Sequence, residues 1–291
     1  MTETARSESR TRRDLCPGVL RPWPADDGAL VRVRLVGGEI SRSALRKLGR
    51  VAETHGDGNL HLTSRANLQL RGFPSADGRL APAALAALES TGLVPHPTHD
   101  LVRNVMVSPL TGLHGGRADL RPTARAFDDL LCSDQRLAEL PGKFLVVLDD
   151  GRGDLVDHPL DLGAVAVDDQ RAQLRAGQRR WGDVVPIDEV PHRLIELAHA
   201  FLDTRGEGPS AAWHVDELDE PGLDKLGLGG VRDPRTEVAS SPLPYGGFGA
   251  GIHVEVADGV LTPKTLKVVL DIALTEQMIL TPWRGLVLPT R

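Results

Sequence analysis

Residues 30–71 read LVRVRLVGGEISRSALRKLGRVAETHGDGNLHLTSRANLQLR, and residues 252–288 read IHVEVADGVLTPKTLKVVLDIALTEQMILTPWRGLVL. The two stretches carry the same succession of apolar and polar positions. Aligned residues are 221 positions apart at first and 218 apart after the expected helix, as in the pairs Val31 with Ile252, Leu45 with Leu266, and Thr63 with Thr281. Solenoid repeats recur every 20–50 residues or so. One repeat at this much larger distance predicts two halves of a pseudo-symmetric unit, with a different domain between them.

Each copy has the pattern of a strand, a helix and two further strands. In the first copy we expect strands at 30–36, 60–63 and 68–71, a helix from Ser41 to about Glu53, and a second helix at about 82–90. In the second copy Thr262 and Pro263 form a helix start, because a capping hydroxyl precedes proline at the first helical position. This order of elements predicts an α+β fold of the ferredoxin-like type.

The residues between the copies have a different character. Residues 143–148 form a nearly continuous apolar run, which is typical of a buried strand. We therefore predict two ferredoxin-like half-domains that form a pseudo-twofold unit, with a central α/β domain between them. The expected ranges are a disordered tail at 1–14, a first half-domain at 15–98, the central domain at 99–230 and a second half-domain at 231–291. The Gly- and Pro-rich residues 220–244 are the expected linker.

Composition narrows the class of protein. The 291 residues carry a net charge of −6, which argues against nucleic acid as a partner. Only five of the 34 basic residues are lysine. Genomic base composition explains this simply, and recognition of planar anions by arginine is the alternative. No segment reaches about 18 uninterrupted apolar residues, so we expect no membrane partner. The absence of a hydrophobic signal segment within residues 1–13 agrees with a cytoplasmic protein.

The two cysteines, Cys16 and Cys132, limit the metal chemistry of the chain. They exclude a disulfide framework and any self-contained Cys₄ zinc or iron–sulfur site. Two other segments deserve comparison with metal sites. His96–Asp100 offers an incomplete ligand set, and in Asp149–Asp154 glycines stand where a calcium loop needs oxygen ligands. We expect no metal site in either segment.

The segment TSRANLQLRG, residues 63–72, is the leading candidate for binding chemistry. It places Arg65 at the tip of a predicted hairpin, where a side chain is poorly placed for core packing and well placed to bind an anion. For an isolated arginine, a solvated turn would be the simpler explanation. Arg103 and Lys143 make anion binding the better explanation, because both also stand at the ends of predicted elements. A polyanionic ligand would require several such cations.

These segments resemble a known superfamily. LHLTSRANLQLRG, LVRNVMVSPLTG and LPGKFLVVLDDGRGD resemble three landmarks of the siroheme-dependent nitrite and sulfite reductases. CPGVLRPWPADDGALVRVRLVGG and DDGRGD are more similar to the precorrin-3B synthases within it. The resemblance implies that Arg65, Arg103 and Lys143 bind the carboxylates of a tetrapyrrole; it identifies no catalytic residue. It also implies a precorrin-3B synthase-like oxidoreductase of aerobic cobalamin biosynthesis, which oxygenates precorrin-3A.

The resemblance also implies a [4Fe–4S] cluster, whose cysteines in this superfamily lie in a domain beyond the second half-domain. We therefore expect no cofactor held by this chain alone, and a separate cluster-bearing half or an electron donor as a partner. Two alternatives remain open. One is a siroheme nitrite or sulfite reductase, which would require siroheme as well. The other is a non-catalytic module that binds the tetrapyrrole without converting it.

Overall fold

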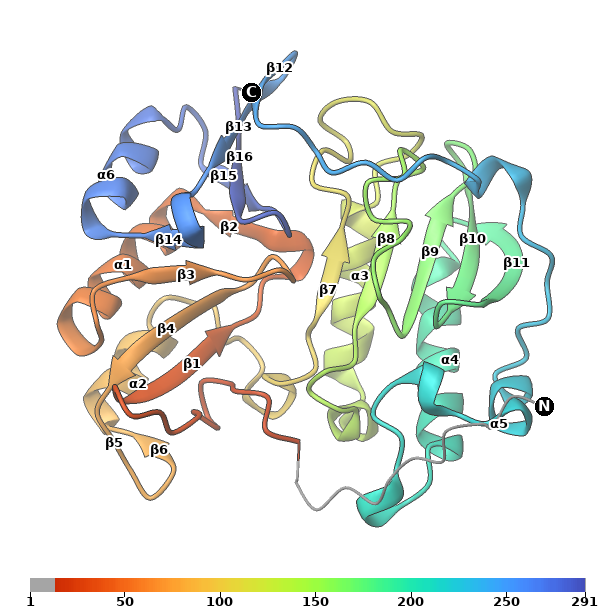
Figure 1. The fold of residues 1–291 in the computed structure, drawn as a ribbon, viewed down its shortest axis with the longest axis horizontal. Helices are drawn as coiled ribbons and strands as arrows, with labels where there is room; N and C mark the ends of the chain where they lie inside the picture. Colours follow the sequence, from red (N-terminus) through yellow and green to blue (C-terminus); the bar gives the residue numbers. More distant parts are fainter. Residues whose placement is uncertain (1–13, 291) are drawn as a thin grey trace.

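The computed structural model describes residues 14–290 and consists of two half-domains beside a central domain (Figure 1). Both half-domains lie on one side, with the second (blue) next to the first (red to orange), and the central domain (yellow to cyan) lies on the other. No helix in the described part of the chain is long and apolar enough to cross a membrane. Of the tail predicted at residues 1–14, only Asp14 lies within the described residues.

The two half-domains share a core of two strands, a helix and two further strands, and each has additional elements of its own. The first comprises β1 (Ala29–Val33), β2 (Glu39–Ser41), α1 (Arg42–His55), β3 (Leu60–Leu62), β4 (Leu68–Phe73), β5 (Ser75–Ala76), β6 (Arg79–Leu80) and α2 (Pro82–Glu89). The second comprises β12 (Gly246–Phe248), β13 (Gly251–Glu255), β14 (Val260–Leu261), α6 (Pro263–Ile272), β15 (Gln277–Leu280) and β16 (Gly285–Pro289). The helix caps agree with prediction, because the side chains of Ser41 and Thr262 accept backbone N–H bonds at the starts of α1 and α6.

The half-domains exchange one short strand each. The first sheet has the order β1-β4-β3-β14, so its last strand comes from the second half-domain. The second sheet has the order β12-β13-β16-β15-β2, and its last strand comes from the first. This reciprocal pairing is what a pseudo-twofold axis requires, and it confirms the symmetry that the repeat predicted. The exchange itself was not predicted, since it depends on pairing between segments far apart in the sequence.

One hydrophobic core serves both half-domains. Leu45 and Leu48 of α1 are fully buried in the same cluster as Leu266 and Val269 of α6. Gly49 lets the two helices approach, because a Cβ at that position would lie 2.3 Å from the Leu266 side chain. The half-domains therefore form one folding unit rather than two independent ones.

The central domain has its own core. It contains β7 (Val105–Val107), α3 (Arg121–Ser133), β8 (Val146–Asp149), β9 (Leu162–Ala166), β10 (Arg171–Ala176), β11 (Arg180–Pro186), α4 (Val190–Thr204) and α5 (Glu220–Lys225). The sheet order is β11-β10-β9-β8-β7, with β7, β8 and β9 parallel. Helices α3 and α4 pack on one face of this sheet. The two faces of the sheet have separate apolar clusters. Phe144 belongs to the cluster under the helices, and its neighbour Leu145 belongs to a smaller cluster on the other face.

The structure differs from the sequence prediction at several places, and the strand predicted at 30–36 ends at Val33. The buried strand predicted at 143–148 begins at Val146, so residues 143–145 form its approach. The predicted linker, residues 220–244, contains the short helix α5. That helix has its own start signal, because Asp219 caps it and proline follows in the first turn. The overall richness in glycine and proline masked this local signal.

Candidate functional site

The tip of the β3–β4 hairpin carries Arg65. The Thr63 hydroxyl accepts hydrogen bonds from the backbone N–H groups of Arg65 and Asn67, at 3.3 and 3.1 Å. Ala66 closes the turn in the left-handed region, with φ of 54°. Nη1 of Arg65 donates to the carbonyl oxygen of Lys143 at 2.8 Å. The hairpin tip therefore docks on the approach to β8, and two of the three predicted residues lie side by side.

Asn104 joins that approach segment to the hairpin. Its Oδ1 accepts hydrogen bonds from Nε of Arg34 at 3.0 Å and from Nδ2 of Asn67 at 3.5 Å, while its Nδ2 donates to the Gly142 carbonyl at 3.0 Å. All three of these side chains are buried. Burial lowers the pKa of Arg34 to about 10, which leaves it charged at neutral pH. The network thus fixes the positions from which Arg65 and Lys143 project.

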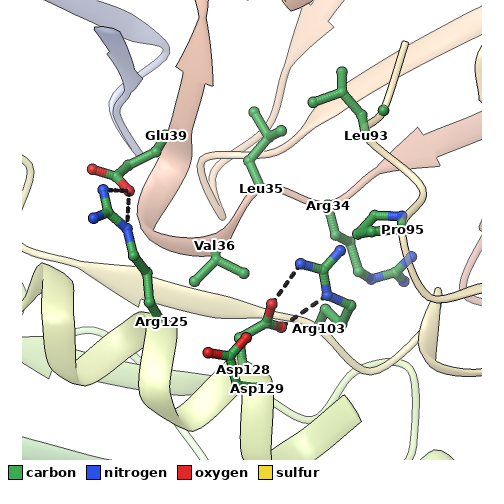
Figure 2. Close-up of a pocket in the computed structure, with 11 residues that line it drawn as sticks. Arg34, Leu35, Val36, Glu39, Leu93, Pro95, Arg103, Arg125, Asp128 and Asp129 are labelled. Carbon is green, nitrogen blue, oxygen red and sulfur yellow. Dashed lines mark hydrogen bonds and ion pairs between the residues drawn. The ribbon is translucent and has the colours of Figure 1, made fainter. Parts of the chain in front are cut away.

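Arg103 lies elsewhere. Its Nε and Nη2 donate to the two carboxylate oxygens of Asp128 at 2.8 and 2.6 Å, and both side chains are 12% exposed. Burial opposes the charge, but the hydrogen-bonded Asp128 outweighs it and raises the pKa of Arg103. The pair lines a cavity of about 350 Å³ beside α3, shown in Figure 2. The structure therefore does not bring Arg103 into the cavities that Arg65 and Lys143 line.

Two adjoining cavities flank Arg65 and Lys143. The first, here called the cationic pocket, has a volume of about 420 Å³ and is lined by Leu15, Cys16, Pro17, Trp23, Arg32, Lys143 and Trp213. The second, here called the acidic pocket, has a volume of about 440 Å³ and is lined by Arg65, Leu145, Asp157, Pro159, Leu160, Asp161, Gln178, His214, Asp216 and Glu217. Residues 143–145 and 213–214 form a wall between them, because members of each segment line both sides. Both volumes suit small-molecule binding.

The cationic pocket combines two positive charges with aromatic surface. Arg32 projects from β1, where its neighbours Val31 and Val33 face the core. Nη2 of Arg32 donates to Gln69 at 3.3 Å, while its buried Nε has no hydrogen-bond partner. Burial lowers the pKa of Arg32. Nζ of Lys143 lies 5.4 Å from the ring centroid of Trp213, within cation–π range. These groups suit a flat ligand with carboxylate arms.

The acidic pocket has the opposite character and contains a histidine–aspartate pair. The Asp161 carboxylate is 1% exposed and accepts backbone N–H bonds from Leu145 at 2.8 Å and Val215 at 2.9 Å. Nδ1 of His214 lies 3.3 Å from each of its oxygens. The imidazole is therefore oriented by a buried carboxylate and lines the cavity that Arg65 also lines.

The sequence prediction named Arg65 and Lys143, which the structure places at these cavities, and it did not name Arg32, Asn104 or His214. A signal for Arg32 did exist, since an arginine at an alternating strand position must face away from the core. For Asn104 the signal was weak: it directly follows Arg103, which drew attention, and it precedes the apolar residues 105–107. Nothing in the sequence indicated His214, because its partner Asp161 lies 53 positions away.

The cysteines do not fit a cubane cluster, which takes about four thiolate ligands. Cys16 lines the cationic pocket, and Cys132 lies on α3 beside Asp128. Burial raises the pKa of both thiols, to about 12 for Cys132, so neither is disposed to ligate as a thiolate. Two thiols at these positions do not make up the ligand set of such a cluster.

The segment Asp149–Asp154 forms a tightly bonded loop. Carboxylate oxygens of Asp149, Asp150 and Asp154 lie within 4.8 Å of one another. Asp149 accepts three backbone N–H bonds of the loop, and Asp150 pairs with Arg152. These contacts account for Asp149 and Asp150 as parts of a turn, and Asp154 accepts a hydrogen bond from the Ser108 hydroxyl.

The hairpin and the sheets around it define a known class of half-domain. Residues 24–89 match the family model described as the nitrite/sulfite reductase ferredoxin-like half domain. The structure of the NirA protein of Mycobacterium tuberculosis resembles this one with a TM-score of 0.65, covering 89% of this chain and 53% of that chain at 20% identity. These matches confirm the fold predicted from the sequence, with its half-domains and central domain.

Particular relatives agree with the predicted resemblance. A precorrin-3B synthase of Sinorhizobium sp is 31% identical over 172 residues, covering 58% of this chain and 34% of that protein. A ferredoxin–nitrite reductase of Synechococcus elongatus is 32% identical over 214 residues, covering 65% of this chain and 41% of that protein. The chain is thus similar to both, and it spans about a third to two fifths of their length.

Proposed function

We propose that this chain is a precorrin-3B synthase-like oxidoreductase chain, which binds a carboxylate-rich tetrapyrrole for the oxygenation of precorrin-3A in aerobic cobalamin biosynthesis. The observation that carries the proposal is the grouping of Arg32, Arg65 and Lys143 around two adjoining cavities. Within residues 14–290, no carboxylate pairs with any of the three. Unpaired cations from three separate segments are what a ring with several acidic arms would require.

The role of each cation follows from its surroundings. Arg32 and Lys143 would bind carboxylate arms in the cationic pocket, where Trp23 and Trp213 offer flat surfaces. Arg65, held at the hairpin tip, would bind a further arm at the boundary between the pockets. Arg103 is assigned a different role, because its guanidinium is already bound to Asp128. It joins the approach to β7 to helix α3.

The chain's residues bind and orient the ring, and electron transfer requires more than they supply. We propose that a separate cluster-bearing polypeptide or domain acts with this chain, together with an electron donor. The support is chemical, since the two cysteines do not form a cluster site while the nitrite reductase relative is a redox enzyme by name. We derive no reaction step through the cluster.

The test is a titration of the chain with uroporphyrin III, a stable metal-free ring that carries acetate and propionate arms. Arg65→Ala should raise Kd roughly 5- to 150-fold, because a charge-assisted contact contributes about 1–3 kcal/mol. Arg46→Ala, on the exposed face of α1, is the matched control and should leave Kd unchanged. Arg103→Ala should also leave Kd within about twofold while lowering stability, since Asp128 loses its partner. A wild-type chain that does not bind the ring would overturn the proposal.

A second candidate is a siroheme-dependent nitrite reductase-like chain, which the nitrite reductase relative and the NirA fold favour. The two candidates differ in the metal of the ring. Titrations with siroheme and with metal-free sirohydrochlorin distinguish them. Tighter binding of the metal-free ring supports the synthase, whereas tighter binding of siroheme supports the reductase. Binding of either ring without turnover in the presence of a cluster-bearing partner would indicate a non-catalytic module.

A further inference from the structure

The acidic pocket contains a pair of residues that ring binding alone does not require. Asp161 precedes β9, and His214 precedes a short 3-10 helix at Val215–Glu217. An ionised carboxylate only accepts hydrogen bonds, so Nδ1 of His214 carries the hydrogen that faces Asp161. Nε2 then lies on the opposite side of the imidazole, and no hydrogen bond to it is found within residues 14–290. The side chain is 36% exposed and lines the cavity.

The charges around His214 come from each element that surrounds the acidic pocket. Asp157 and Asp161 lie in the loop before β9, Asp216 and Glu217 lie in the 3-10 helix, and Arg65 lies on the hairpin tip. Asp216 accepts a hydrogen bond from the Gln178 backbone at 3.0 Å. Arg65 is the one permanent cation among the residues that line this cavity within the described chain. A protonated His214 would be the second.

We propose that Asp161 and His214 form an acid–base pair that exchanges a proton with the part of the bound ring that reaches past Arg65 into the acidic pocket. The inference rests on the proposed function, since it takes the tetrapyrrole as the ligand. In the donating step the N–H bond at Nε2 breaks and a new bond to hydrogen forms on the ligand, using an electron pair of the ligand. The imidazolium becomes neutral imidazole, and Asp161 remains a carboxylate. Water in the open cavity returns the proton to Nε2.

The geometry explains why this arrangement suits proton transfer. Two backbone N–H groups hold the Asp161 carboxylate, so its position does not depend on His214. The carboxylate in turn fixes the tautomer and the orientation of the ring, as in other carboxylate–imidazole pairs. Imidazole is the side chain whose ordinary charge change falls nearest neutral pH. A flat ring that reaches past Arg65 into this cavity would meet Nε2.

The experiment measures proton uptake when the intact chain binds uroporphyrin III. Calorimetric titrations at pH 7 in phosphate and in Tris, which differ in ionisation enthalpy, give the number of protons taken up per ring bound. Wild type should take up more protons than His214→Asn, by up to one per ring. The asparagine Nδ2 replaces Nδ1 as the donor to Asp161, so this variant keeps the structural contact and loses only the titrating nitrogen. Arg65→Ala should bind more weakly and keep the uptake of wild type.

The possible results separate the inference from the proposed function. Equal proton uptake by wild type and His214→Asn, with the ring bound to both, would overturn the acid–base pair and leave ring binding intact. Absence of ring binding by wild type would overturn both proposals. Because the variant could fold poorly, ¹⁵N spectra of the His214 ring in wild type provide a second measurement. Addition of uroporphyrin III should move the signals of both imidazole nitrogens toward those of the protonated form. Unchanged signals in a saturated complex would overturn the acid–base pair.

Discussion

The two hairpin tips of the half-domains share one backbone but differ in chemistry. In the first tip Ala66 has φ of 54°, and in the second its repeat equivalent Arg284 has φ of 60°. The hydroxyl of Thr63 accepts the N–H of Asn67, and that of Thr281 accepts the N–H of the equivalent Gly285, both at 3.1 Å. The repeat has therefore preserved the turn in atomic detail.

The side chains at the tips differ completely. Arg65 projects toward the cavities, whereas its equivalent Trp283 packs against an apolar cluster on the central sheet. The cluster contains Met106, Leu145, Val147, Leu155 and Leu160. Leu145 and Leu160 also line the acidic pocket, so both tips adjoin the same part of the central domain. One tip therefore presents a cation to a cavity, and the other holds its half-domain against the central domain.

The supports behind the tips differ as well. Behind the first, the Asn67 side chain reaches Asn104 and through it Arg34. Behind the second, Gly285 has no side chain, and the ring of His253 fills the space and bonds to Thr281 at 3.0 Å. An amide network supports the tip that carries the cation, and an imidazole supports the tip that carries the indole.

The largest expected effect comes from breaking the first support with Asn104→Ala. We expect the free energy of unfolding to fall by about 3 kcal/mol, because Arg34 and Asn67 lose partners inside the core. Ring affinity should fall with it, since the hairpin and the approach to β8 lose the buried one of their two links and keep only the bond from Arg65 to the Lys143 carbonyl. Urea denaturation measures the first effect, and a uroporphyrin III titration measures the second.

Asn59→Ala is the control for that change. Asn59 lies in the loop before β3 and is partly exposed, and its hydrogen bonds within residues 14–290 go to Asp57, so its loss should cost less than about 0.5 kcal/mol. If the two asparagine variants proved equally stable, the proposed structural role of the Asn104 hydrogen bonds would be refuted. If Asn104→Ala lost stability but kept ring affinity, the position of Arg65 would not depend on the Asn104 hydrogen bonds.

A smaller loss should follow when the second support is disturbed by Gly285→Ala. A Cβ at this position would lie 2.3 Å from Nε2 of His253 and 2.8 Å from the Val254 carbonyl. We expect a loss of about 2 kcal/mol in thermal or urea denaturation, from overpacking against ring and backbone. Gly247→Ala, in the edge strand β12, meets no atom within 4 Å and should be nearly neutral. Equal stabilities of the two variants would contradict the fit of His253 against Gly285.

The sequence predicts some features of the fold better than others, and the repeated half-domains are predicted best. The half-domains and their turns were predictable, because local patterns around Ser41 and Thr262 occur twice and agree. The exchange of β2 and β14 was not, since short strands pair according to tertiary contacts. For the site, Arg65 was recognisable as a cation on a rigid tip. Whether a cation is free depends on its neighbours in space, and this is why Arg103, bound to Asp128, could not be distinguished from Arg65 by sequence.

The smallest expected effect is a difference in pH dependence. The His253 support of the second tip should make stability depend on pH, and the amide network behind the first tip should not. Burial lowers the pKa of His253 from its ordinary 6.5, so the folded ring stays neutral while the unfolded chain takes up a proton. The unfolded state then binds more protons below about pH 6.5, and the stability that this group contributes is lost as the pH falls through that value. The amide network behind the first tip has no group that titrates in this range, since the pKa of Arg34 is about 10.

His253→Gln tests this difference through urea denaturation at pH 7.5 and 5.5. The variant is expected to be less stable at both values, because glutamine does not fill the space of the ring, but its stability should change less between them than that of wild type. Asp154 contributes with the opposite sign, since burial and the nearby Asp149 raise its pKa to about 7 and favour the folded state as the pH falls. That contribution is common to both proteins and cancels in the difference. Equal changes would mean that the imidazole takes up its proton inside the folded half-domain, and the neutral ring could not then be the support of the second tip.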